Sequence, residues 1–196
     1  YVWAVETKNQ ANAMRAAFST DQDKGVYMSN AGTFDSEAPL IEVSLEGEVV
    51  GEQHIIGGHT DFAQTHNGEV AVLAWDVREL TDDGETRTIV GDKLMIVEPT
   101  GHQTELWSTF DLFWPDLSIE YDHRFSANPD AEDWSHGNGL SYDPEDDALF
   151  ISLAGLDAVV KLDRATGEAI WMLRNMGGSF DTGGNFLLGL PHSVYA

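Results

Sequence analysis

The chain has 196 residues, of which 42% are hydrophobic and 10% aromatic, so it can bury a core and is not expected to be disordered. Ten lysines and arginines oppose 34 aspartates and glutamates, and the resulting formal charge of −24 disfavours nucleic acid and anionic membranes as partners. The absence of cysteine excludes disulfides, thiolate nucleophiles and cysteine-ligated metals, and no apolar segment is long enough to span a membrane.

Short β-branched and aromatic runs, separated by glycine, aspartate and proline clusters, predict strands along the whole chain. Residues 1–12 are similar to the end of a repeat, and residues 13–57 form the first complete one. A second, longer repeat covers residues 58–133, a third covers residues 134–190, and residues 191–196 begin another. The same outline of strand, glycine turn and strand therefore recurs three times.

The second repeat departs most from this outline. Its buried-type strand at residues 70–75 is followed by a polar excursion from 76 to 91, before the next strand at 93–97. The stretch from 110 to 133 is interpreted as an insertion that is aromatic at first and then acidic. Both segments are expected to lie outside the regular strands of the repeat.

Repeats of roughly 45 residues with about four strands each predict an all-β fold of β-propeller blades. A sandwich or barrel is the competing architecture, but it does not predict repetition of one outline. We interpret residues 1–196 as a single, partial propeller domain covering about three to four blades. A propeller needs at least ~4 blades to close, so the remainder of the propeller or another chain is expected to complete the ring.

Three histidines occupy the same place in their repeats, at the start of the innermost strand: His59, His136 and His192. Innermost strands line the central channel, so these side chains are expected to converge near one mouth of it. The first repeat has Ala13 or Met14 at this place, so the blade itself does not need a histidine. A functional reading is therefore favoured over a structural one. The other histidines lie in turns or loops and are expected to be exposed bystanders: His54, His66, His102 and His123.

Residues 133–171 carry a family resemblance. They contain Asp133-Trp134-Ser135-His136-Gly137-Asn138, a Tyr-Asp-Pro-Glu-Asp-Asp hairpin from residue 142 to 147, and a Lys-Leu-Asp stretch at 161–163 that is followed by Thr-Gly. This pattern resembles the bacterial arylsulfotransferase family, in which the motifs read Asp-Trp-x-His-x-Asn, Tyr-Asp-Pro-Glu-Asp-Asp and Lys-Ile-Asp…Thr-Gly…Trp. Residues 58–62 and 191–193 are similar to two further motifs of that family, and the likeness covers about 58–196.

The resemblance implies a six-bladed propeller and an enzyme that transfers a sulfuryl group from an aryl sulfate to a phenol through a channel histidine. Its partners would be these small molecules, it would need no cofactor, and it would work in the periplasm or outside the cell. His192 would match the nucleophile. His59 and His136 would bind the sulfate or handle the phenolic proton, as imidazole can near neutral pH.

Asn138, Asp61 and Arg15 are the candidate substrate-binding residues. Arg15 enters because the family places an arginine in the strand after the hairpin, where this chain has Ala154. Losing one donor to a developing oxyanion costs on the order of 2.7–4 kcal/mol, and Arg15 could replace that cation. A second departure is Ser193, which stands where the family has an aspartate.

Two alternatives stay open. Three neutral imidazoles without a cation among them could bind a divalent transition metal, so His59, His136 and His192 could form the site of a metal-dependent enzyme. In that case Asp61 or Asn138 would serve as a further ligand or as a support. The other alternative is a non-catalytic propeller that binds a ligand or partner across its face.

Overall fold

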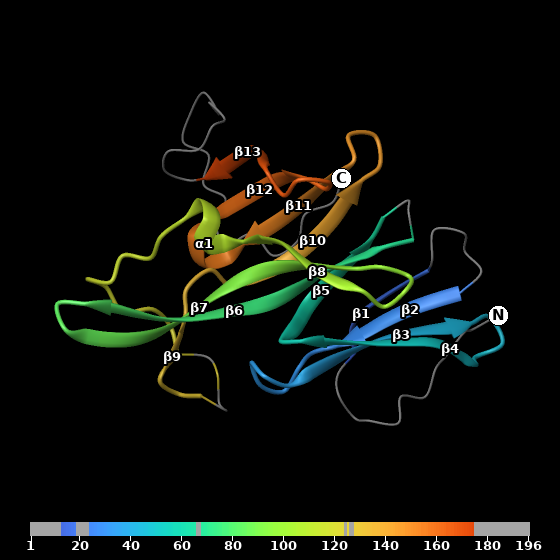
Figure 1. The fold of residues 1–196 in the computed structure, drawn as a ribbon, viewed down its shortest axis with the longest axis horizontal. Coiled ribbons are helices and arrows are strands. Elements are labelled where there is room, and N and C mark those ends of the chain that lie inside the picture. The colour runs from blue at the N-terminus through green and yellow to red at the C-terminus, as the bar shows by residue number, and fades with distance from the viewer. Residues whose placement is uncertain (1–12, 19–23, 66–67, 124, 126–127, 175–196) are drawn as a thin grey trace.

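The computed structural model describes residues 13–18, 24–65, 68–123, 125 and 128–174, with side chains from residue 24 onward. These residues form three antiparallel meanders (Figure 1). The first sheet has the order β1 (Ala13–Phe18), β2 (Lys24–Ser29), β3 (Glu37–Ser44), β4 (Val49–Ile56). The second has the order β5 (Gly58–Gln64), β6 (Val70–Asp82), β7 (Glu85–Val97), β8 (Gln103–Ser108). The third has the order β10 (Gly137–Asp143), β11 (Ala148–Leu153), β12 (Ala158–Asp163), β13 (Ala169–Arg174).

The first strand of each sheet lies on the inside of the arrangement. Strand β5 contacts both β1 and β10, so the innermost strands of the three sheets are neighbours. Sequential four-stranded meanders packed in this way are propeller blades, and the predicted all-β propeller class is confirmed. The sheets span residues 13–56, 58–108 and 137–174. The six-bladed ring stays a prediction.

The run of apolar residues in β6 results from its packing against the blades on both sides. Val72 and Ala74 join a cluster shared with the first sheet, whereas Ala71 and Leu73 join a cluster shared with the third. Successive side chains of a strand point to opposite faces, and here both faces are buried. A strand in the middle of three sheets therefore reads as a continuous hydrophobic stretch and not as an alternating one.

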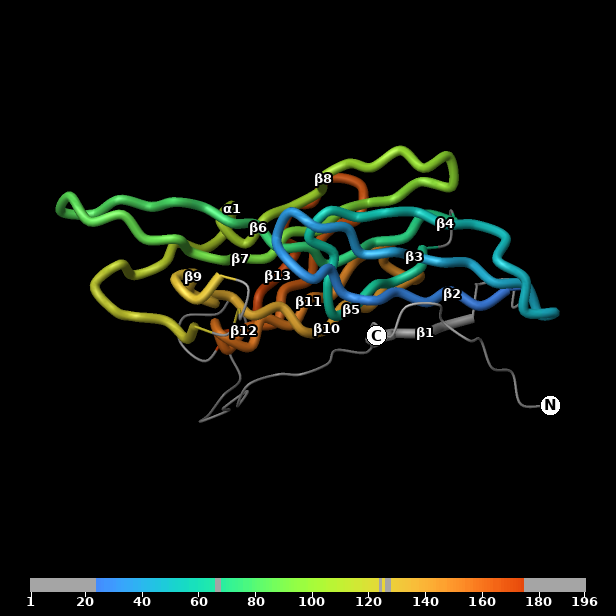
Figure 2. Tube along the Cα trace, turned by 90° about the horizontal axis from the view of Figure 1, so that it is seen from below, coloured from blue at the N-terminus to red at the C-terminus, as the bar shows by residue number. Residues whose placement is uncertain are grey.

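The prediction of a polar excursion between the second and third strands of this repeat was wrong. Strands β6 and β7 continue through it as one long hairpin, paired from Trp75 opposite Asp92 to Asp82 opposite Glu85. The hairpin projects beyond the other blades in both views (Figures 1 and 2). Asp83 (φ 47°) and Gly84 (φ 84°) close it, as a two-residue turn with positive φ at both positions does.

The sequence pattern did not indicate this long hairpin, because other segments of the chain pack against only part of it. The insertion contains a short helix, α1 (Thr109–Leu112), and a strand, β9 (Ala131–Asp133), that pairs in parallel with residues 88–90 of β7. The cover buries Ile89 and Val90 completely, while most of the remaining extension is polar and exposed. No helix among the described residues is long and apolar enough to cross a membrane.

Arg87 of β7 fastens the insertion to the hairpin. Its guanidinium donates to the Glu132 carboxylate, with Nε 2.7 Å from Oε1, and to the backbone carbonyls of Leu117 at 2.6 Å and Ile119 at 2.7 Å. The hydrogen bond from Arg87 lowers the pKa of Glu132 and outweighs burial, which would raise it. Both side chains are largely buried, so the pair is sensitive to the loss of either partner.

Replacing Glu132 with glutamine should therefore destabilise the protein by about 3 kcal/mol at pH 7, because it leaves a buried guanidinium without its counter-charge. A depressed folded-state pKa contributes stability above the unfolded value of about 4.3 and loses it as pH falls through the folded value. The difference between wild type and Glu132→Gln should consequently shrink below about pH 4. Urea unfolding of both proteins at pH 7 and in this acidic range measures it, and an equal difference at both pH values would contradict this role.

Candidate functional site

The inner strands carry a backbone irregularity where the predicted histidines lie. Pairing of β5 with β6 shifts between Gly58 and Phe62, and pairing of β10 with β11 shifts between Gly137 and Gly139. Such bulges re-aim side chains at the end of a strand. Thr60 lies within the first bulge and has a left-handed φ of 57°, and His136 directly precedes the second with a φ of 48°. Left-handed backbone at a β-branched residue is a strained outlier, which is frequent at functional sites.

His59 and His136 line the same cavity, although they come from neighbouring blades. Its volume is about 120 Å³, several times the ~30 Å³ that one water molecule occupies in the liquid. The other lining residues are Thr60, Trp75, Asp92, Phe125, Asp133 and Gly137. The structure thus brings together two of the three predicted histidines.

The His59 ring is fixed on three sides. Its side chain is 5% exposed, its face stacks on Trp75 with centroids 4.9 Å apart, and Nδ1 lies 2.9 Å from the Thr60 hydroxyl oxygen. Nε2 lies 2.9 Å from Oδ1 of Asp92, but this oxygen is off the direction of the ring N–H. The His59 ring and the Asp92 carboxylate are in close polar contact. Within the described residues, Nε2 therefore has no well-directed hydrogen bond.

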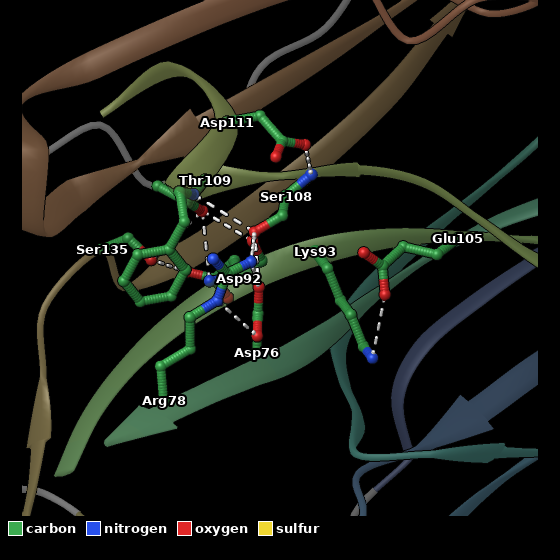
Figure 3. Close-up of polar contacts among 10 residues, drawn as sticks. Asp76, Arg78, Asp92, Lys93, Glu105, Ser108, Thr109, Asp111 and Ser135 are labelled. Atoms are coloured by element: carbon green, nitrogen blue, oxygen red, sulfur yellow. Dashed lines mark hydrogen bonds and ion pairs between the residues drawn. The ribbon is translucent and has the colours of Figure 1, made fainter. Parts of the chain in front are cut away.

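Asp92 is a buried carboxylate at the centre of the site. Its Oδ2 accepts a hydrogen bond from the Ser135 hydroxyl at 2.5 Å (Figure 3). The same oxygen accepts from the Gly137 backbone N–H at 2.6 Å. Burial would raise the pKa of Asp92, but His59, Ser135 and Gly137 together hold it below its ordinary value. Asp92 is consequently an anion at neutral pH. Thr109 of α1 fixes the backbone here, since its hydroxyl donates to the Asp92 carbonyl at 2.7 Å and accepts from the Asp92 N–H.

His136 is held by a second carboxylate. Its Nδ1 lies 2.5 Å from Oδ2 of Asp133, and its side chain is about one third exposed. The backbone carbonyl of His136 accepts from the Ala154 N–H at 3.0 Å, and the Ser135 carbonyl accepts from the Gly155 N–H at 3.0 Å. Both donors belong to the 3₁₀ turn η1 (Ala154–Leu156). Ala154 is therefore a buried neighbour of the His136 backbone, at the place where the family has its arginine.

The cavity is acidic. Two aspartates line it, and no lysine or arginine occurs among its described lining residues. Each carboxylate faces a histidine, Asp92 with His59 and Asp133 with His136. Two aspartate–histidine pairs around a small cavity can orient the imidazole rings. They provide acid–base groups and N–H donors, but no net positive charge.

Two of the predicted substrate-binding residues, Asp61 and Asn138, are not among the residues that line the cavity. Asp61 is buried and connects two blades, since its oxygens accept from the Phe62 N–H and the Leu140 N–H, each at 2.9 Å. The Asn138 side-chain oxygen accepts from the Ser152 hydroxyl at 2.9 Å. Arg15 belongs to β1, of which the structure describes only the backbone. Substrate binding by these three residues stays a prediction.

His192 and Ser193 lie outside the described residues, and so do the final blade fragment and residues 1–12. Among the residues that are described, no group of three or more histidine, aspartate and glutamate side chains could hold a metal ion. The three-histidine metal site includes His192, so it stays a prediction. The other described histidines have exposed side chains away from the cavity: His54, His102 and His123.

Sequence reasoning missed several residues of the site. Asp133 stood inside the motif that carried the resemblance but received no role. Asp92 lies 43 positions before Ser135, directly after the stretch that was interpreted as a polar excursion. Nothing in its local pattern marks it, because its partners come from other strands. Trp75 and Phe125 look like ordinary core and loop aromatics until the fold places them beside His59.

The arylsulfotransferase (ASST) family model matches residues 1–189. No curated protein matches this chain in sequence. Several solved structures are similar to it in fold. The hydrazine synthase of Kuenenia stuttgartiensis is 17% identical over 76% of this chain and 39% of that chain, with a TM-score of 0.52.

A putative 6-phosphogluconolactonase from Bacteroides uniformis is 11% identical over 90% of this chain and 45% of that chain, with a TM-score of 0.48. The β-propeller domain of Cps50 (Swd1) from Myceliophteria thermophila is 16% identical over 88% of this chain and 60% of that chain, with a TM-score of 0.36. At such identities a likeness concerns the fold alone, and only the first of these scores is high enough to support it. The chain spans about two fifths to three fifths of the length of these proteins.

Proposed function

Because the chain belongs to the arylsulfotransferase family, we propose that it forms part of an enzyme that transfers a sulfuryl group from an aryl sulfate to a phenol. The observation that carries the proposal is the cavity into which neighbouring blades direct His59 and His136. Sulfuryl transfer needs a nucleophile, an acid–base group and hydrogen-bond donors to the sulfuryl oxygens. The cavity offers the last two, and His192 is our candidate for the first.

The proposed reaction has two steps. A ring nitrogen of His192 attacks sulfur, the new S–N bond forms, and the S–O bond to the aryl oxygen breaks. Protonated His136 gives its proton to the leaving aryl oxide. The acceptor phenol then attacks sulfur, the S–N bond breaks, and the phenolic proton passes to His136, which is restored. Asp133 orients the His136 ring through its contact at Nδ1.

His59 is suited to bind a sulfuryl oxygen. Its Nε2 faces Asp92, lines the cavity and has no well-directed hydrogen bond within the described residues. A sulfuryl oxygen placed in the cavity beside Nε2 could share this ring N–H. The stacked Trp75 ring keeps His59 from turning away.

The negative charge of the site must be offset before an anionic substrate can bind. Aryl sulfates are anions, and the cavity contains the carboxylates of Asp92 and Asp133. We propose that the ring N–H groups of His59 and His136 face the sulfuryl oxygens and that Arg15 supplies the cation that Ala154 does not. From its membership of this family we also propose that the protein works in the periplasm or outside the cell.

An aromatic wall beside His59 supports an aryl substrate. Trp75 and Phe125 line the cavity with their ring centroids 5.6 Å apart, and Phe34 packs edge-on against both, at 5.2 Å and 4.8 Å. Edge-to-face packing of this kind fixes the rings of the wall. An aryl ring entering the cavity would contact a rigid aromatic surface while its sulfate group faces the histidines.

Replacing Trp75 with leucine should raise KM for an aryl sulfate about tenfold, because aromatic contacts are worth about 0.5–1.5 kcal/mol beyond the area they bury. Initial rates over a range of substrate concentrations measure the change. Trp114→Leu is the matched control, since Trp114 is 64% exposed and lines a different hollow. An unchanged KM in Trp75→Leu would exclude this wall from aryl binding.

The function is tested by incubating the full-length protein with an aryl sulfate and a phenol and measuring the sulfated product. We expect transfer in the wild type, and loss of transfer in His192→Ala. His102→Ala should behave like the wild type, because His102 is exposed in a turn far from the cavity. Absence of transfer by the wild type, or undiminished transfer by His192→Ala, would contradict the proposal.

A further inference from the structure

One buried side chain connects the strands that carry the two histidines of the cavity. Asp92 lies on β7 of the second blade, His59 lies on β5 of the same blade, and Ser135 and Gly137 flank His136 at the start of the third blade. The Asp92 carboxylate contacts His59, Ser135 and Gly137 at 2.5–2.9 Å. It is therefore placed to influence His59 directly and His136 through its neighbours.

The two oxygens of this carboxylate have separate partners. Oδ1 faces Nε2 of His59, whereas Oδ2 accepts both the Ser135 hydroxyl and the Gly137 N–H. We propose that Asp92 is the positioning residue of the site, which sets the tautomer of His59 with one oxygen and the placement of His136 with the other. This inference rests on the proposed sulfuryl transfer for its kinetic consequences, but not for its structural ones.

The surroundings leave the carboxylate little freedom. Its side chain is 3% exposed, and Thr109 binds both the N–H and the carbonyl of its backbone. A Cβ atom at position 137 would come within 2.7 Å of Asp92 Cγ, so only glycine lets the third blade approach this closely. A displacement of Asp92 must therefore be transmitted to the segment that holds His136.

The same geometry selects one tautomer of His59. A carboxylate cannot donate a proton, so neutral His59 carries its hydrogen on Nε2, facing Asp92. Nδ1 is then left to accept from the Thr60 hydroxyl, 2.9 Å away. This tautomer directs the ring N–H toward the side of the cavity, where a sulfuryl oxygen could share it. The opposite tautomer would present a lone pair there and repel an anionic oxygen.

Replacing Asp92 with asparagine separates the contact with His59 from the hydrogen bonds with Ser135 and Gly137. Its amide oxygen can take the place of Oδ2 and keep the hydrogen bonds from Ser135 and Gly137. Its amide NH₂ then faces His59 and can only donate, which forces the hydrogen of the imidazole onto Nδ1. Ser135→Ala does the reverse, because it removes one hydrogen bond to Oδ2 and leaves the contact with His59 in place.

The experiment compares Asp92→Asn, Ser135→Ala and Asp76→Asn with the wild type in the full-length protein. Asp76 is the matched control, since it is also a largely buried aspartate, bonded to Ser108 and Arg78, and it touches neither histidine (Figure 3). The ¹⁵N chemical shifts of the His59 ring report its tautomer without any need for activity. Steady-state kinetics with an aryl sulfate and a phenol report kcat and KM.

We expect the hydrogen of His59 to move from Nε2 to Nδ1 in Asp92→Asn and to stay on Nε2 in Ser135→Ala and Asp76→Asn. The kcat should fall about 100-fold in Asp92→Asn, with KM within about threefold, as for loss of one acid–base or oxyanion contribution. An unchanged tautomer in Asp92→Asn, or the same change in Asp76→Asn, would overturn the proposal. If the wild type transfers no sulfuryl group, the proposed function fails, and the tautomer measurement alone decides the role of Asp92.

Discussion

Replacing His136 with asparagine should lower kcat for sulfuryl transfer by about 100-fold or more, because the site loses the group that protonates the leaving oxide and accepts the phenolic proton. Asparagine is chosen because it removes the imidazole and still suits the backbone conformation at this position. His136 has a φ of 48°, and asparagine adopts this left-handed backbone more readily than alanine does. The fold around the bulge should therefore persist, and the loss should be chemical.

Steady-state rates with donors of different leaving-group basicity measure this effect. If His136 protonates the leaving oxide, the variant should be most impaired with the most basic leaving groups, which need the proton most. His102→Asn is the control, because it makes the same chemical change at an exposed turn. Equal kcat values for wild type and His136→Asn, with a basic leaving group, would remove His136 from the mechanism.

Replacing Gly155 with alanine should destabilise the protein by about 3 kcal/mol, the upper end for an inserted methyl group in a packed site. An ideal Cβ at this position lies 2.2 Å from the Trp134 carbonyl oxygen and 3.1 Å from its carbon. The obstructing atoms belong to the backbone, so no side chain can rotate away. Relief of the clash must separate η1 from the segment that carries His136, because Ala154 and Gly155 donate to that segment.

Urea unfolding of Gly155→Ala measures the stability, and kcat measured where the variant remains folded reports the displacement of His136. Gly32→Ala is the control, since the nearest atom to its new Cβ is the Ser36 hydroxyl oxygen at 3.8 Å. Both the free energy of unfolding and kcat should decrease together in Gly155→Ala. A variant as stable as Gly32→Ala would show that η1 does not hold the His136 segment in the way described.

The fold was largely predictable because the blade repeats. The hydrophobic run at 70–75 indicated a strand buried on both faces, and the glycine turns separated each strand from the next. The long β6–β7 hairpin was not predictable from its own residues. Its inner part is covered in part by β9 and the rest of the insertion, which includes Glu132, 45 positions after its partner Arg87. A strand whose buried part is covered by a segment far away in the sequence shows no regular hydrophobic pattern of its own.

The candidate site was predictable in part for the same reason. Equivalent positions in successive repeats converge near the axis, so the repeat pattern was enough to bring His59 and His136 together. Asp92 could not be found this way, because it lies on β7 and reaches the site through cross-strand and inter-blade contacts. Asp61, a predicted substrate-binding residue, accepts two backbone N–H groups, and substrate binding by it stays a prediction. The carboxylate that contacts the His59 ring is therefore that of Asp92 and not that of Asp61, its neighbour in sequence.

The covalent step at a channel histidine is the central claim, and the intact mass of the protein tests it most directly. The full-length protein is mixed with an aryl sulfate in the absence of a phenol and quenched in alkali, because an N-sulfo imidazole is labile in acid. We predict a mass increase of one sulfuryl group, located on the peptide that contains His192 and lost when a phenol is added before the quench. Release of the aryl alcohol with no mass increase on any histidine peptide would contradict the account.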